Sequence, residues 1–338
     1  MPPRWLRRLL LPPLVLLLTL VVTTTMPVWL IALAALSSLP VLDRSRVLRV
    51  VWFVVLYLLV ESIALVALFG LWIAAGFGVA IRAPWSERAH YWLVSRLLAV
   101  LYREAQRVLR LSVEVEGPDP ASYAGKPLVV CCRHAGPGDS LLLVHALVNI
   151  YDREPRIVVK DTLQWDPVID VVLHRLPNRF VDPDPGRTGE VVTAQIAQLA
   201  SNLDGDDALV IFPEGGNFSE HRRARAIARL RDGGRISEAE HAERLRHVLA
   251  PRPGGLLAAL ERARDADVLW VAHTGLDRLH SVADVWRELP VAKRIQMRWW
   301  QVPASEVPDD GDQQVAWLWS WWTTIDEWIT ERSDRRAP

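Results

Sequence analysis

Two long stretches near the N-terminus consist almost entirely of apolar and uncharged residues. No charged residue occurs between positions 9 and 42, and Glu61 is the only one between positions 50 and 81. Each stretch exceeds the roughly 20 residues that a helix needs to cross the hydrocarbon core of a bilayer. The pattern therefore predicts an N-terminal membrane anchor over residues 1–82. It would be a transmembrane helical hairpin of two apolar segments, about 9–42 and 50–81.

The sequence leaves the arrangement of these segments in a membrane open. Pro27 either breaks or kinks the first segment, or that segment tilts and extends into the interface. Arginines flank both segments on every side, so the positive-inside rule gives no unique orientation. In the simplest arrangement both ends of the hairpin, and all that follows, are cytoplasmic. A cleaved signal peptide fits less well, because its apolar region is only about 7–15 residues long.

Beyond residue 82, strand-like runs alternate with segments of helical spacing. Residues 85–111 have the spacing of an amphipathic helix. Strand-like runs follow at 112–116, 127–132, 156–159, 179–181, 208–212, 268–273 and 295–302. Helical segments lie at 139–150, 189–203, 220–231, 238–250 and 255–264. The alternation predicts that residues 83–338 form an α/β domain with a mainly parallel sheet flanked by helices.

The composition excludes several classes of protein. The 338 residues include 39 Lys or Arg and 39 Asp or Glu, so the zero net charge argues against a whole-protein nucleic-acid footprint. The only two cysteines, Cys131 and Cys132, exclude a disulfide scaffold or a cysteine-rich zinc module. We expect both to be buried strand residues rather than reactive thiols. The spacings of histidines and acids resemble no metal site, so we expect neither a metal nor a bound cofactor.

A first candidate for chemistry follows the strand-like run at 127–132. His134 and Asp139 flank a Gly-Pro-Gly turn that leads into a helix. Such a turn can fold the carboxylate back onto the imidazole, so that the other ring nitrogen accepts a proton from a bound hydroxyl. No Gly-x-Ser-x-Gly or His-Glu-x-x-His motif is present, which favours direct attack by a substrate hydroxyl. Asp139 would also cap the helix whatever His134 does.

A second candidate follows the strand-like run at 208–212. Pro213 ends the strand and Glu214 emerges beside Gly215 and Gly216. Two glycines let backbone N–H groups approach a ligand, as in an anion or oxyanion cradle. The alternative is an ordinary glycine turn with a solvated Glu214.

The two candidates together resemble the glycerophospholipid acyltransferase superfamily, of the 1-acylglycerol-3-phosphate O-acyltransferase type. The motifs that carry the resemblance are His134-x4-Asp139 and, some 75 residues later, Phe-Pro-Glu-Gly at 212–215. Looser blocks at 160–163, 178–182 and 249–255 are similar to further family blocks. The pattern is most similar to the lysocardiolipin and lysophosphatidate acyltransferase subgroup, and it covers about residues 95–330.

The resemblance implies transfer of an acyl group from acyl-CoA or acyl carrier protein to a lysophospholipid hydroxyl at a membrane bilayer. His134 would be the general base and Asp139 its orienting partner. Residues implied in substrate binding are Glu214, Gly215, Gly216, Arg252, Arg179 and Lys160. No metal, cofactor or nucleic acid is implied. The alternatives are a catalytically inactive lipid-binding relative and a membrane-bound lipid hydrolase that activates water.

Two departures from the family pattern concern the acceptor. The third block usually continues Thr-Arg, where this chain has Gly216 and Asn217, and the second usually ends Asp-Arg, where it has Asp182 and Pro183. Asn and Pro cannot replace a bidentate arginine. The positive charge would then come from other arginines: Arg252, Arg179, Arg187 or Arg133. The acceptor therefore need not be a simple phosphomonoester.

Two further segments have an unusual composition. The arginine-rich insert at 219–250 would either bind anionic lipid head groups or form a solvated face. The tryptophan-rich segment at 313–332 has helical spacing. A membrane interface and packing on the sheet both explain it, and packing is the favoured interpretation.

Overall fold

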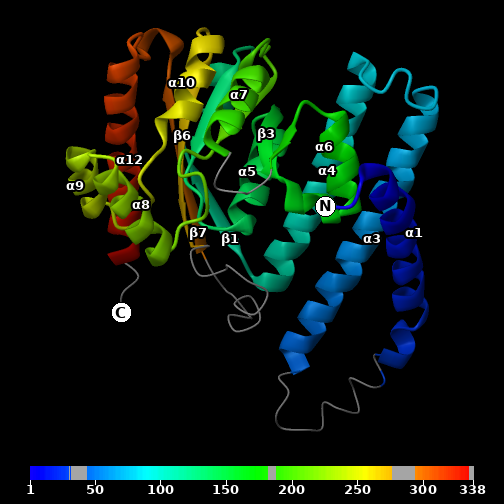
Figure 1. Cartoon of the computed structure of the whole chain (residues 1–338). Helices are drawn as coiled ribbons and strands as arrows, with labels where there is room; N and C mark the ends of the chain where they lie inside the picture. Colours follow the sequence, from blue (N-terminus) through cyan, green and yellow to red (C-terminus); the bar gives the residue numbers. More distant parts are fainter. Residues whose placement is uncertain (30, 32–43, 182–187, 276–293, 335–338) are drawn as a thin grey trace. The chain divides into compact units, whose positions relative to one another are not determined.

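The computed structural model describes residues 1–29, 31, 44–181, 188–275 and 294–334 (Figure 1). The chain divides into two compact units. The first comprises Met1–Ser112, Val159–Pro183 and Ser281–Lys293, and the second Val113–Val158, Asp184–His280 and Arg294–Pro338. The anchor boundary expected at residue 82 stays a prediction.

A seven-stranded sheet has the strand order β1-β7-β6-β2-β5-β3-β4. The strands are β1 (Ser112–Glu116), β2 (Leu128–Cys132), β3 (Glu154–Lys160), β4 (Arg179–Val181), β5 (Asp207–Ile211), β6 (Asp267–Thr274) and β7 (Arg294–Val302). β2 pairs in parallel with both β5 and β6, and β3 in parallel with β5, whereas β7 is antiparallel to β6. The prediction of a mainly parallel sheet flanked by helices is confirmed. All residues of β2, β5 and β6 are buried, which explains why each of these strands contains a continuous apolar run.

The second unit contains most of the helices that the sequence predicts. They are α5 (Pro137–Asn149), α7 (Thr188–Ala200), α8 (Glu220–Asp232), α9 (Ile236–Arg244), α10 (Pro253–Arg262) and α12 (Gly311–Asp334), with short 3-10 turns η1 (Pro120–Tyr123) and η3 (Ala304–Glu306). α12 packs against β6 (Figure 1). The side chains of Trp322, Ile325 and Leu318 on α12 are fully buried. The packing interpretation of the tryptophan-rich segment is therefore confirmed.

One predicted helix is too long. The segment expected to be helical at 238–250 forms α9 only as far as Arg244. The residues that follow are held by side chains from elsewhere: the Asp326 carboxylate accepts hydrogen bonds from the Arg246 and His247 N–H groups, and Glu214 accepts one from Leu249. These contacts are distant in sequence, so helical spacing cannot reveal them.

The first unit is built from long helices. They are α1 (Arg4–Thr24), α3 (Arg44–Ala74) and α4 (Pro84–Leu109), with the shorter η2 (Asp161–Trp165) and α6 (Pro167–Arg175). α1 ends in a bend at Thr25, two residues before Pro27, so the first apolar stretch is interrupted there. Arg4–Thr24 and Val47–Ala74 are long and apolar enough to cross a membrane. Most of the large apolar side chains of α1 are exposed.

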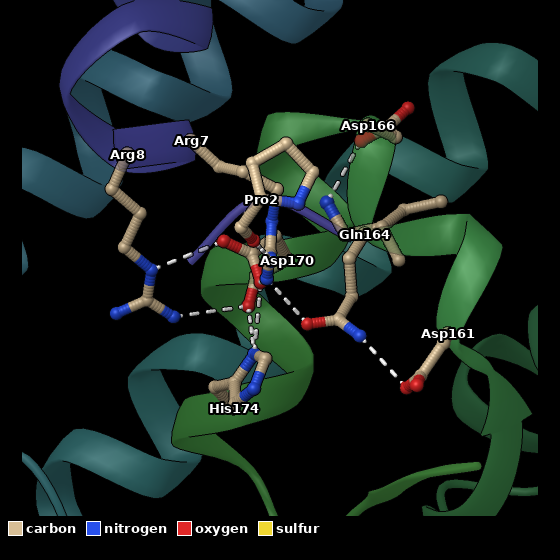
Figure 2. A network of polar contacts seen from close by, with 9 residues as sticks. Pro2, Arg7, Arg8, Asp161, Gln164, Asp166, Asp170 and His174 are labelled. Atoms are coloured by element: carbon tan, nitrogen blue, oxygen red, sulfur yellow. Dashed lines mark hydrogen bonds and ion pairs between the residues drawn. The ribbon is translucent and has the colours of Figure 1, made fainter. Parts of the chain in front are cut away.

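A polar network joins α1 to α6 within the first unit (Figure 2). The Asp170 carboxylate on α6 forms ion pairs of 3.1 Å with Arg7 and with Arg8. Its Oδ1 atom also lies 3.1 Å from His174 Nδ1, one helical turn further on. Arg7 additionally donates to Gln164 of η2. Both Arg7 and Asp170 are buried, so the start of α1 is fixed by a desolvated charge pair.

Candidate functional site

The loop between β2 and α5 brings His134 and Asp139 together. β2 lies between β5 and β6 in the sheet, and Asp139 is in the first turn of α5. The Nδ1 atom of His134 lies 3.1 Å from Oδ1 and 3.3 Å from Oδ2 of Asp139. Because a carboxylate only accepts, Nδ1 carries the proton and Nε2 remains free to accept another. This is the arrangement that the sequence predicts for a general base and its orienting partner.

The Asp139 carboxylate is buried and surrounded by donors. It accepts hydrogen bonds from the backbone N–H groups of Ala135 and Gly136 and from the Ser140 hydroxyl. Burial by itself would raise the pKa of Asp139, but hydrogen bonds and charge interactions with His134 and His273 hold that pKa well below its usual range. Asp139 therefore stays ionised and can stabilise a protonated His134.

Glu214 is fixed inside the protein rather than solvated. Its Oε1 accepts from the His134 N–H at 2.8 Å, and its Oε2 accepts from the Leu249 N–H at 3.0 Å. The Phe218 N–H donates to the His134 carbonyl at 2.7 Å, which ties the same loop to His134. Burial raises the pKa of Glu214 to about 8, although Arg133 and the two N–H donors oppose that rise. The geometry makes Glu214 a link between the His134 loop and the segment before Arg252.

The glycine pair Gly215 and Gly216, the double glycine, lies next to two guanidinium groups. Gly215 has a positive φ of 66°, and a Cβ atom there would lie 3.1 Å from the guanidinium carbon of Arg252. A Cβ atom on Gly216 would lie 3.3 Å from Nη1 of Arg222. The Gly215 N–H donates to the Phe212 carbonyl, so of the two expected oxyanion donors the Gly216 N–H remains the candidate. The positive φ explains why glycine occupies position 215.

Arg252 supplies positive charge beside Gly215. In the part of the chain that the structure describes, no carboxylate forms an ion pair with Arg252. Burial and the nearby Arg229 lower the pKa of Arg252. An exposed arginine next to a glycine turn, with no ion-paired carboxylate among the described residues, is suited to bind an anion.

The remaining predicted binding residues belong to the first unit. Lys160 ends β3, and Arg179 begins β4, where it donates to the Asn178 carbonyl. The expectations for Asp182, Pro183 and Arg187 lie outside the described residues. Among the residues that are described, no group of three His, Cys, Asp or Glu side chains could hold a metal ion.

Sequence reasoning overlooked His273. It lies near the carboxyl end of β6, and its Nε2 is 3.4 Å from Oδ2 of Asp139. A signal was present, because a histidine ending a strand of apolar residues is unusual and β6 is the neighbour of β2. That neighbour relation, however, becomes known only from the sheet order.

Three comparisons with known proteins bear on this site. The acyltransferase family matches residues 112–267, a range that contains His134, Asp139, Glu214 and Arg252. An uncharacterized acyltransferase of Schizosaccharomyces pombe is 23% identical over 186 residues, which are 51% of this chain and 50% of that protein. This chain thus spans about half the length of that relative.

The fold is similar to the crystal structure of the 1-acyl-sn-glycerophosphate (LPA) acyltransferase PlsC from Thermotoga maritima. The TM-score is 0.51 at 15% sequence identity, and the match covers 86% of this chain and 100% of that one. At this identity the likeness concerns the fold.

Proposed function

Since the chain belongs to the glycerophospholipid acyltransferase superfamily, we propose that it transfers a fatty acyl group to the hydroxyl of a lysophospholipid. The donor would be acyl-CoA or acyl carrier protein, and the acceptor 1-acylglycerol-3-phosphate or another lysophospholipid. The observation that carries the proposal is the contact between His134 Nδ1 and the buried Asp139 carboxylate, which leaves Nε2 as a base. The role of the product would be in phospholipid synthesis or remodelling.

The reaction is derived from these groups. His134 Nε2 accepts the proton of the acceptor hydroxyl as its oxygen attacks the thioester carbonyl carbon. The resulting oxyanion is stabilised by a backbone donor such as the Gly216 N–H. Collapse forms the ester bond, breaks the carbon–sulfur bond, and returns the proton from His134 to the departing thiolate. General-base catalysis of this kind contributes roughly 10²–10⁴-fold, and Asp139 supports it by stabilising the imidazolium.

The anionic part of the acceptor would bind beside the double glycine. Among the described residues, no carboxylate forms an ion pair with Arg252, and Arg222 lies over Gly216. These side chains supply charge where the family pattern has a Thr-Arg pair. Arg179 and Lys160 remain proposed substrate-binding residues of the first unit.

Membrane attachment belongs to the same proposal, because a lysophospholipid resides in a bilayer. Large apolar side chains lie exposed on α1 and α3, whereas soluble proteins rarely expose so extensive an apolar surface. Leu14, Leu17 and Ile63 are examples. We place the active site on the cytoplasmic side, where acyl-CoA is available.

The test uses purified full-length protein in detergent, acyl-CoA or acyl carrier protein as donor, and a panel of lysophospholipids. We expect acceptor-dependent thiol release with formation of a diacyl lipid, and a loss of roughly 10²–10⁴-fold in His134→Ala. The matched control is His241→Ala, because His241 contacts Thr323 and Trp319 and is remote in sequence from the dyad.

Two outcomes would contradict acyl transfer. Free fatty acid without a diacyl product would identify a hydrolase. Folded protein that releases no thiol with any donor and acceptor would favour a catalytically inactive lipid-binding relative.

A further inference from the structure

A second histidine shares the carboxylate of the proposed dyad. His273 is buried, with 2% of its side chain exposed. Its Nε2 lies 3.4 Å from Asp139 Oδ2 and 3.2 Å from the Arg133 carbonyl oxygen. Arg133 in turn donates from Nη1 to the His273 carbonyl at 2.8 Å. These two reciprocal hydrogen bonds join the ends of β2 and β6. Arg133, which makes them on the β2 side, directly precedes His134 in the chain.

The surroundings of His273 fix its tautomer. Both neighbours of Nε2 are oxygens that only accept, so Nε2 carries a proton and donates. The other ring nitrogen, Nδ1, is buried and has no hydrogen-bond partner among the described residues. Buried ring nitrogens without a partner are uncommon. The Nε2–H group of His273 points between the Arg133 carbonyl, its hydrogen-bond acceptor at 3.2 Å, and the Asp139 carboxylate at 3.4 Å.

We propose that His273 is a positioning residue for acyl transfer: it donates to Asp139 Oδ2 and so holds the carboxylate in the orientation that His134 requires. This inference rests on the proposed function. Oδ1 is contacted by His134 and Ser140. Oδ2 is contacted by the backbone N–H groups of Ala135 and Gly136, by His134 Nδ1 at 3.3 Å and by His273 Nε2 at 3.4 Å. Of these four groups, only His273 reaches Oδ2 from outside the loop that carries His134 and Asp139. Replacing His273 removes its contact to Oδ2 and leaves the other hydrogen bonds to the Asp139 carboxylate in place.

The consequence is a specific kinetic effect. A loosened carboxylate stabilises the His134 imidazolium less well in the transition state, whereas the binding of either substrate is unaffected. We therefore expect kcat to fall and KM to stay nearly constant. The expected loss is roughly 10- to 100-fold, the range for one hydrogen bond to a charged group.

The test compares three variants of the full-length protein. His273→Gln keeps an N–H donor near the position of Nε2, His273→Asn is polar but too short to reach Asp139, and His273→Leu has no donor. We expect kcat to fall roughly 10- to 100-fold in the Asn and Leu variants and to stay within about 3-fold of wild type in the Gln variant. The Gln and Asn pair keeps the test valid if the Leu variant does not fold. His145→Leu, which also removes a buried histidine, is the control for packing.

An activity-independent measurement separates this proposal from the proposed function. In ring-nitrogen NMR spectra, the His134 Nδ1–H resonance should shift in the Asn and Leu variants and stay in place in the Gln variant. If the wild-type protein transfers no acyl group, this spectrum still decides whether His273 positions the dyad. Equal kcat in all variants, an unchanged resonance, or a Gln variant as impaired as the Asn variant would overturn the proposal.

Discussion

At the scale of single residues, Glu214 shows how strongly burial determines the behaviour of a group. Its carboxyl group lies between the N–H groups of His134 and Leu249, and it is almost fully buried. The pKa is about 8, compared with an ordinary value of about 4.5. Between these two pH values the folded protein holds a proton that the unfolded chain has lost. The stabilisation is therefore fully present below about pH 4.5 and disappears as the pH rises through about 8.

Replacing Glu214 by Gln tests this dependence. The neutral amide cannot titrate, so we expect the variant to lack the part of the pH dependence that Glu214 contributes, about 4 kcal/mol between pH 5 and pH 8. One amide N–H would face a backbone N–H, so the variant should be less stable than wild type at pH 5. The measurement is the free energy of unfolding from pH 5 to pH 8. The gap between the two proteins should narrow with rising pH, and parallel curves would contradict the assignment.

The dyad could be predicted from the sequence because its members are five residues apart on one strand-to-helix turn. The setting of Glu214 could not, because one of its partners comes 35 residues later. His273 was missed for the same reason: 134 positions separate it from Asp139, and only the pairing of β2 with β6 brings the two strands together. Local spacing therefore reveals the reactive pair, whereas its supporting contacts require the fold.

At the scale of elements, the buried strands were predictable and the short helix α6 was not. Each of β2, β5 and β6 contains a continuous apolar run of at least four residues. The sequence of α6 has several β-branched residues and only nine positions, so its helical spacing is weak. Its stability comes from tertiary contacts: Asp166 caps it, Glu61 accepts from the Val168 N–H, and Val171 and Val172 are buried in the core of the first unit.

The element α12 offers a direct test of the core of the second unit. Trp322 is fully buried, and the centroid of its ring lies 6.3 Å from that of Trp270. Its Nε1–H group donates to the Leu249 carbonyl. We expect Trp322→Ala to lower the free energy of unfolding by about 3–5 kcal/mol, because it leaves a cavity and an unpaired carbonyl. Denaturant unfolding in detergent measures this change.

The control for that substitution is Trp92→Ala on α4, since the Trp92 side chain is 60% exposed. We expect it to change the free energy of unfolding by less than about 1 kcal/mol. Similar losses in both variants would mean that α12 does not pack on the sheet as described.

At the scale of the whole molecule, the contacts of α3 bear on how the first unit meets a bilayer. Near its start, Arg49 donates to the Val108 carbonyl and Trp52 donates to Glu104, both at the end of α4. Further along α3, Tyr57 and Glu61 contact the start of α6. A bilayer crossed by α3 would also have to hold the charged residues of α4, namely Glu87, Arg88, Arg96, Arg103, Glu104 and Arg107. Under the proposed membrane attachment, we therefore expect the exposed apolar faces of α1 and α3 to lie in one leaflet.

Cysteine labelling distinguishes this arrangement from the crossing hairpin. Single cysteines would replace Leu48 at the start of α3 and Arg107 in the last turn of α4, both of which are exposed. In inverted vesicles we expect an impermeant maleimide to label both positions, and in right-side-out vesicles neither. Labelling of the two positions from opposite sides would instead establish a hairpin that crosses the membrane.

The two native cysteines have a practical consequence for all of these experiments. Cys131 and Cys132 are fully buried in β2, and burial raises the pKa of both thiols. They are the only cysteines in the chain. We therefore expect the native cysteines of the folded protein not to react with thiol-reactive dyes. Colour in an activity assay would then report thiol released from the proposed donor, and an attached label would report the cysteine that was introduced. The same burial protects the two thiols of β2, the strand that leads to His134, from oxidants and alkylating agents while the protein stays folded.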